Sequence, residues 1–375
     1  MASPGQPGPP SSYGAASSPS PAPASISTPP APLPMAAPSI PNLLGRLGNG
    51  PPRAGRGGRR GLGRGNGLGG GLHAGNQAQL RGGGMPRRLD HNGIVQSTDT
   101  DAAISRMSAV DIGLLDDPFA QYFAGDGGGP VPRRLPIINR VLARKRNIVQ
   151  SVPAIRSLLT GPTTEHTSVG GDDPPKTDSS TGPRSWQAEL GSGNQFWAHG
   201  LDLRELAAGA GGGLATLPGL RTDVPTLLVS ECCLCYLQPS EAAAVLRWFG
   251  DRVNAPSASL GVVIYEPIRP FDAFGRTMVA NLAGRGIEMP TLVAYPDGAA
   301  QEVRLQQEAG LTRAKHQTID QIWRAWVTDD EQERVNRLDG LDEVEEWELL
   351  ASHYVVAWGS RGAHFDAAWA QLYGQ

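Results

Sequence analysis

Hydrophobic residues recur in short runs from about residue 196 onward, and segments with helical spacing lie between these runs. Val224–Cys235 is a continuous apolar run, as expected for a strand buried on both faces of a parallel sheet. Phe196–Gly200 and Ser259–Glu266 are two further short apolar runs, and His353–Trp358 is a final, largely apolar run. We expect all four segments to be strands.

Helices are predicted around these strands. After Gln96, Thr98 or Asp99 can cap a helix that ends before Pro118, because a residue that precedes proline is pushed out of the α region. Ser240 is the expected capping residue of the next long helix. The other helical segments are Asp202–Leu206, Pro239–Phe249, Asp272–Leu282 and Ala299–Gly310. Strands that alternate with helices indicate an α/β protein with a Rossmann-like, doubly wound sheet.

Two stretches lack any such pattern. Residues 1–92 are rich in Ser, Pro, Ala, Gly and Arg, and residues 161–185 are polar and rich in Pro and Gly. Neither stretch can bury enough apolar surface to offset the entropy of ordering its backbone, so we predict a disordered tail and a disordered surface insertion. The tail can be a solvated segment, an RNA-contacting Arg-Gly tract or a transit peptide. The folded domain is expected to occupy 93–375.

Charge and cysteine content narrow the cellular setting. The net charge is −3, yet Met1–Met85 contains no Asp or Glu, so the folded body is acidic and nucleic-acid binding by it is not expected. No apolar run is long enough for a membrane helix, and no hydrophobic signal region follows Met1. Cys232, Cys233 and Cys235 lack a second Cys/His cluster for zinc and are expected to be free thiols. We therefore expect a cytoplasmic monomer without a metal.

Two acidic residues follow predicted strands. Asp202 comes after Phe196–Gly200, and Glu231 lies near the end of the long apolar run. A doubly wound sheet binds its ligand at the carboxyl ends of its strands, where a carboxylate can accept hydrogen bonds from a nucleoside. From their positions alone, an ordinary acid that faces water is the better interpretation of each residue.

Several ordered blocks of the sequence resemble the leucine carboxyl methyltransferases of type 2A protein phosphatases. The resemblance extends roughly over residues 93–362, and no block is specific by itself. The blocks are, in chain order, ISRMSAVDIGLLDDPFAQYF, LPIINR, GLDLREL, PTLLVSECCLCYLQPSEAAAVLRWF, VVIYEPIRPFDAFGRTMVANL and LDEVEEWELLASHYVVAWGSRG.

The resemblance implies a class I methyltransferase fold and a specific reaction. Such enzymes transfer the methyl group of S-adenosyl-L-methionine to the α-carboxylate of the C-terminal leucine of the phosphatase catalytic subunit. No strong base is needed, because that carboxylate is already ionised at neutral pH. By the same resemblance, Arg106 faces the methionine carboxylate, Asp202 and Leu203 flank the adenine, and Glu231 lies beside the donor. Arg140 is the expected ligand of the leucine carboxylate, and no catalytic residue is assigned.

The sequence departs from the family in one region. Family members have, after their Asn-Arg pair, a strand that runs into Gly-x-Gly and a second strand that ends in Asp-x-Pro. Here Asn139-Arg140 runs almost directly into Ala143-Arg144-Lys145, so several dozen residues are absent. The run Gly209–Gly213 follows a helix instead of a strand and does not replace the lost loop. We therefore expect incomplete central strands and poor donor binding, as in a mis-spliced or mis-predicted version of an active enzyme. A non-catalytic relative that binds the phosphatase tail or RNA is the alternative.

Overall fold

The computed structural model describes residues 91–124, 137–166, 185–207, 214, 216–255, 258–338 and 344–374. The predicted disordered tail lies outside these ranges except for its last two residues, which begin α1 (His91–Asp111). Of the predicted surface insertion, 167–184 lies outside them as well, and so does the glycine run Gly209–Gly213.

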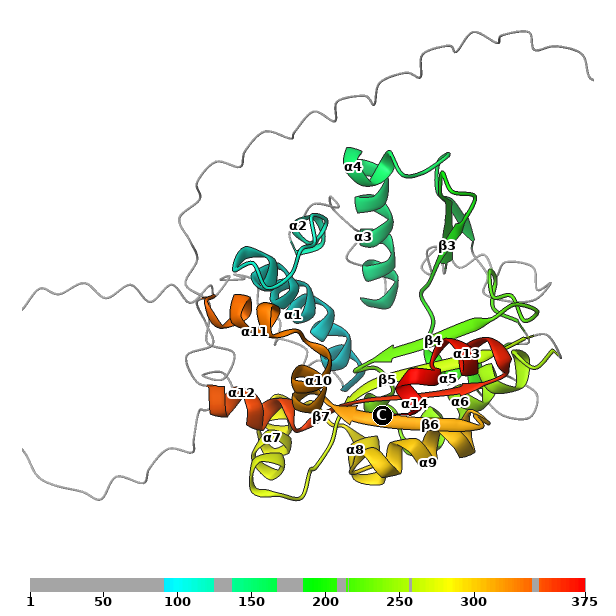
Figure 1. Ribbon diagram of the computed structural model, residues 1–375. Helices are drawn as coiled ribbons and strands as arrows, with labels where there is room; N and C mark the ends of the chain where they lie inside the picture. The colour runs from blue at the N-terminus through cyan, green and yellow to red at the C-terminus, as the bar shows by residue number, and fades with distance from the viewer. Residues whose placement is uncertain are drawn as a thin grey trace, which may run out of the picture. The chain divides into compact units, whose positions relative to one another are not determined.

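A four-stranded mixed sheet forms the centre of the fold (Figure 1). Its order is β4 (Thr226–Glu231), β5 (Leu260–Pro267), β7 (Tyr354–Arg361) and β6 (Arg313–Thr318). β4 and β5 are parallel, and β7 is antiparallel to both of its neighbours. This arrangement confirms the expected α/β class and is consistent with a methyltransferase fold.

Helices α6 (Pro239–Arg252) and α9 (Gly298–Glu308) cover one face of this sheet. The main core forms there: Leu246 and Leu305 pack with Val262 and Ile264 of β5, and all four side chains are completely buried. α6 begins at Pro239, as the sequence predicted, but its capping box joins Gln238 to Glu241, and Pro239 occupies the first turn. Ser240 is therefore not the capping residue.

Two short helices, α13 (Ala363–Ala368) and α14 (Ala370–Tyr373), cover the part of the second face that contains Gly261 of β5. Gly261 of β5 allows this packing, because a Cβ atom there would lie 2.8 Å from the Trp369 ring and 2.9 Å from the Phe365 ring. Over β4 the same face is open. Leu227 and Val229, which point to it, are 50% and 62% exposed.

The prediction that Val224–Cys235 is buried on both faces is therefore wrong. β4 forms hydrogen bonds with β5 alone and lies at the edge of the sheet, and only six residues of the run are strand. Leu228 packs on the main core and Ser230 is buried, whereas their neighbours on the opposite face are exposed. The physical reason is that no strand of the described ranges lies beyond β4, which is what we expect when the preceding central strands are absent.

A separate antiparallel sheet contains β1 (Thr164–His166), β2 (Ser185–Glu189) and β3 (Gln195–His199). The predicted strand Phe196–Gly200 is thus a strand of this small sheet and not of the parallel one. A second core cluster lies here: Trp186, Ala188 and Leu142 of α3 (Ile137–Ser151) are buried together. The Trp186 indole donates a hydrogen bond to the Leu142 carbonyl over 3.2 Å. The two ends of the predicted insertion are therefore paired strands.

The remaining elements connect these layers. Arg285, after α7, forms an ion pair with Asp101 of α1 at 2.9 Å. Among the helices of the described ranges, none combines the length and the hydrophobicity that a bilayer crossing requires. These elements are α2 (Ala120–Ala124), α4 (Pro153–Arg156), α5 (Leu203–Ala207), η1 (Leu234–Tyr236), α7 (Ala273–Gly284), α8 (Pro290–Ala294), α10 (Ile319–Trp326), α11 (Asp329–Asn336) and α12 (Val344–Ala351).

Candidate active site at the carboxyl end of β4

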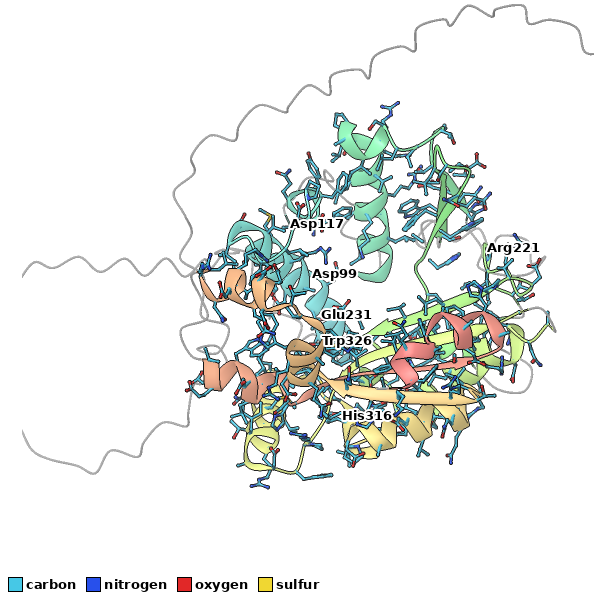
Figure 2. All side chains as sticks on the ribbon, viewed as in Figure 1. Asp99, Asp117, Arg221, Glu231, His316 and Trp326 are labelled. Carbon is cyan, nitrogen blue, oxygen red and sulfur yellow. The ribbon has the colours of Figure 1, made fainter. Side chains whose placement is uncertain are left out.

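Glu231 is the last residue of β4 (Figure 2). In the register of the sheet it lies opposite Tyr265 of β5. The next residue, Cys232, donates its N–H to the Tyr265 carbonyl over 2.8 Å and has a positive φ of 41°. The chain then turns through η1 into α6. Glu231 is exposed and accepts no hydrogen bond from the described residues, so its carboxylate is available to a ligand.

Tyrosine side chains form an aromatic wall beside this strand end. The rings of Tyr265 and Tyr354 are stacked with their centroids 5.4 Å apart. Burial raises the pKa of Tyr354 to about 12, and burial also raises the pKa of Tyr265 and of Tyr236. All three phenols therefore stay protonated at neutral pH. An available carboxylate next to neutral aromatic hydroxyls can bind a ligand that has both an apolar surface and hydroxyl groups.

Asp202 lies between β3 and α5 and is held by Arg204. The Arg204 side chain donates to both carboxylate oxygens, from Nε over 2.9 and 3.1 Å and from Nη2 over 2.5 Å. The hydrogen bond from the Arg204 side chain is the main cause that lowers the pKa of Asp202. Leu203 packs against the main core, and α5 contacts α6. Asp202 is thus ionised, but its acceptor oxygens are already engaged.

Arg106 projects from α1 and forms a 2.6 Å ion pair with Asp117. Its side chain is 58% exposed. The hydrogen bond from Arg106 is the main cause that lowers the pKa of Asp117, and the Phe119 N–H contributes from 2.9 Å. Arg140 lies in α3, where only the backbone belongs to the described part of the molecule.

The structure does not assemble these residues into one pocket. Within the described ranges, no hydrogen bond or ion pair joins Arg106, Asp202 and Glu231 to one another. Asp202 comes after β3, which belongs to the small antiparallel sheet, whereas Glu231 is the last residue of β4 in the large sheet. The two carboxylates therefore do not lie at the ends of neighbouring strands. Their predicted roles remain predictions. In the same ranges, no group of three or more His, Cys, Asp or Glu side chains could hold a metal ion.

The described residues do not fit a complete site for S-adenosylmethionine. Such a donor is held by backbone amides of a glycine turn that follows a buried strand and opens a helix. The connections that follow the two parallel strands β4 and β5, Cys232–Gln238 and Ile268–Asp272, contain no glycine. What is present is one flank of a pocket, formed by Glu231 and the tyrosine wall.

The residues that contact the predicted site residues were not predicted from the sequence. Arg204 could have been found, because a basic residue two positions after Asp202 can reach back to it at a helix start. Asp117 was considered only as the residue before Pro118 that ends a helix, and its ion pair with Arg106 was not predicted. Tyr265 and Tyr354 occur in quoted motifs, but their stacking depends on the β5–β7 pairing, which joins residues 89 positions apart in the chain.

Comparison with known proteins agrees with the fold. No family model matches the chain. Leucine carboxyl methyltransferase 1 of Aspergillus fumigatus is 38% identical over 352 residues, which covers 75% of this chain and 87% of that protein. Leucine carboxyl methyltransferase 1 of Emericella nidulans is 37% identical, with 80% of this chain and 95% of that protein covered. The rat tRNA wybutosine-synthesizing protein 4 is 30% identical over 74% of this chain, but only 46% of that protein is covered.

The first of these comparisons also bears on the missing segment. Its 352 aligned residues correspond to only 75% of the 375 residues of this chain, so several dozen aligned positions have no residue here. The high identity and the nearly complete coverage of the two fungal relatives decide the assignment. The chain belongs to the leucine carboxyl methyltransferase family and is, by that relationship, a methyltransferase.

Proposed function

We propose that the gene of this chain encodes an enzyme that uses S-adenosylmethionine to methylate the C-terminal leucine carboxylate of the protein phosphatase 2A catalytic subunit. The single observation that supports this proposal most is the 38% identity to a leucine carboxyl methyltransferase, 87% of which is covered. The acceptor carboxylate is ionised at neutral pH, so the protein must align and desolvate the reactants and needs no strong base.

In this proposal, the strand end of β4 supplies part of the donor pocket. Glu231 is the available carboxylate there and would accept hydrogen bonds from nucleoside hydroxyls. Asp202 and Leu203 would flank the adenine only if the end of β3, in the small sheet, lay beside the end of β4, in the large sheet. Arg106 and Arg140 are proposed ligands of the two carboxylates, that of the donor and that of the leucine.

We further propose that the chain in its present form binds the donor poorly. The edge of β4 is unpaired, its apolar residues Leu227 and Val229 are exposed, and the aligned relatives have residues where this chain has none. The Arg140–Val141 junction, where we place the loss, lies within the uninterrupted helix α3. A donor therefore lacks the backbone amides that would hold its charged and polar groups.

Calorimetry with S-adenosylhomocysteine tests both proposals together. We expect no measurable binding by this chain. A matched chimaera, in which the corresponding segment of the Aspergillus fumigatus relative is inserted between Arg140 and Val141, should bind it and methylate a phosphatase tail peptide. Micromolar binding by the unmodified chain would refute the incomplete pocket. A chimaera that binds the donor but leaves the tail peptide unmethylated would refute the substrate.

The alternative is a non-catalytic relative that binds the phosphatase tail, or RNA through residues 51–88, without methyl transfer. A transcript read across the Arg140–Val141 junction separates the two. If the messenger RNA contains the missing segment, the enzyme is intact in the organism. If the junction is real, fluorescence anisotropy with a labelled tail peptide and a labelled RNA measures which ligand this chain binds.

A further inference from the structure

Three cysteines surround the turn at the end of β4, and two of them have the spacing of a redox pair. The order Cys232-Cys233-Leu234-Cys235 places the outer two in a Cys-x-x-Cys arrangement. Cys232 is half-buried, Cys233 is exposed and Cys235 is buried. One member of the outer pair is therefore reachable from solvent, and the other is shielded.

The backbone reverses direction between the outer two cysteines. Cys232 has a φ of 41°, in the left-handed region that residues with a Cβ atom rarely adopt. This reversal ends the strand, and η1 begins at Leu234. Cys235 lies in η1, three residues after this reversal, so Cys232 and Cys235 flank one tight turn. Two thiols at this spacing on one turn can become a disulfide through a local rearrangement.

The two thiols differ in their chemistry. The neighbouring Cys235 thiol is the main cause that lowers the pKa of Cys232, although burial opposes it. The Cys232 thiol and burial raise the pKa of Cys235. Because Cys232 is also the more exposed of the two, it is the thiolate that attacks, and Cys235 is the thiol that resolves the product.

We propose that Cys232 and Cys235 are a reversible dithiol–disulfide site that reacts with peroxides and is restored by thiol reductants. The Cys232 thiolate attacks one peroxide oxygen: the S–O bond forms, the O–O bond breaks, and the departing hydroxide takes a proton to become water. The Cys235 sulfur then attacks the sulfenic sulfur. The S–S bond forms, the S–O bond breaks, and hydroxide leaves with the proton of Cys235 as a second water.

This inference does not depend on methyl transfer. In a reducing compartment the dithiol is the resting form, and the disulfide appears only during exposure to the oxidant. The site adjoins Glu231, whose backbone precedes the turn directly. Oxidation would close a ring over the turn that connects this carboxylate to α6.

Mass spectrometry of the purified full chain tests the proposal. All three cysteines lie in one tryptic peptide, 222–247, so the cysteine that remains alkylated after oxidation identifies the pair. After treatment with hydrogen peroxide, we expect this peptide to lose two hydrogen atoms, with the remaining label on Cys233. Dithiothreitol should restore labelling of all three residues. A wild-type peptide without this intramolecular bond, or with the remaining label on Cys232 or Cys235, would overturn the proposal.

Single variants test the roles of the cysteines. Cys235→Ser should stop at a sulfenic acid on Cys232, which dimedone traps, and Cys232→Ser should abolish the disulfide. Cys233→Ser is the matched control and should still form it. Loss of the disulfide in Cys233→Ser, with the native circular dichroism spectrum retained, would assign the reaction to Cys233 instead.

Discussion

Arg304 of α9 donates from Nη1 to the Oε2 atom of Glu266 in β5 across 2.9 Å, and both side chains are almost completely excluded from water. The ring of Tyr295 lies against the guanidinium group, 4.4 Å from its carbon to the ring centroid. Gln301 also contacts both partners. This buried cluster connects α9 to the centre of the large sheet.

Removal of one partner of this pair should destabilise the protein strongly. Glu266→Gln removes the nearer counter-ion of the buried Arg304 charge and leaves only Glu308, whose Oε2 lies 3.5 Å from Nε of Arg304. We expect a loss of about 3 kcal/mol in the free energy of unfolding. Urea denaturation followed by circular dichroism measures it. The exposed pair Arg324–Glu348, at 3.2 Å, is the control: Glu348→Gln should cost about 1 kcal/mol or less. Similar losses in the two variants would contradict the role of burial.

Asp272 connects two elements at once. Its side chain caps α7 by accepting from the Gly275 N–H over 2.7 Å, and it also lies 2.9 Å from Nε2 of the buried His353. Asp272→Ala should therefore cost the cap, about 1 kcal/mol, and a further loss of about 1–3 kcal/mol because a buried ring nitrogen is left unsatisfied. Asp297→Ala removes a comparable cap from α9, where Asp297 accepts from Ala300, without a histidine. Equal costs in thermal melts of the two variants would exclude a contribution from His353.

The decrease in protein stability at low pH should depend on the Asp272 carboxylate. The Gly275 N–H is the main cause that lowers the pKa of Asp272 below its ordinary value of 3.8, and the His353 hydrogen bond assists. A carboxyl whose pKa is lower in the folded state contributes stability above its unfolded pKa and loses it as the pH falls through the folded value. Thermal melts of wild type and Asp272→Asn should therefore differ most near neutral pH and converge below about pH 3. A difference that stays constant down to that pH would assign the effect to uncharged contacts.

The free edge of β4 should promote aggregation. Its outer backbone groups have no strand partner in the described part of the chain, and the exposed Val229 lies in the middle of this edge. Val229→Lys should reduce light scattering at high protein concentration, because a charge on an edge strand opposes pairing with another chain. Val293 in α8 has a similar exposure of 63%, so Val293→Lys is the control and should leave scattering unchanged. Equal suppression by both variants would indicate a general effect of charge.

The sequence was sufficient to predict where most helices and strands lie, but not which strands pair with one another. Spacing predicted α6, α7, α9, β5 and β7 to within a few residues, because each has a continuous apolar face that fits its period. β6 was missed, since Arg313–Thr318 is largely polar and belongs to the sheet only through its hydrogen bonds with β7. Phe196–Gly200 was predicted as a strand correctly, but its sheet was not.

For the candidate site, the strand-end position of Glu231 followed from the length of the apolar run. The hydrogen bonds of Asp202 with Arg204 and of Arg106 with Asp117 did not, because side-chain partners depend on turn geometry that composition does not specify. The exposure of Leu227 and Val229 was not predicted, because the run itself has the pattern of a fully buried strand.

The two core clusters, one around Leu246 and one around Trp186, have no residue in common. Cooperativity requires shared packing, so heat should melt the two clusters in separate calorimetric transitions instead of one. The indole of Trp186 is 1% exposed, so the red shift of its fluorescence should follow only one of the two transitions.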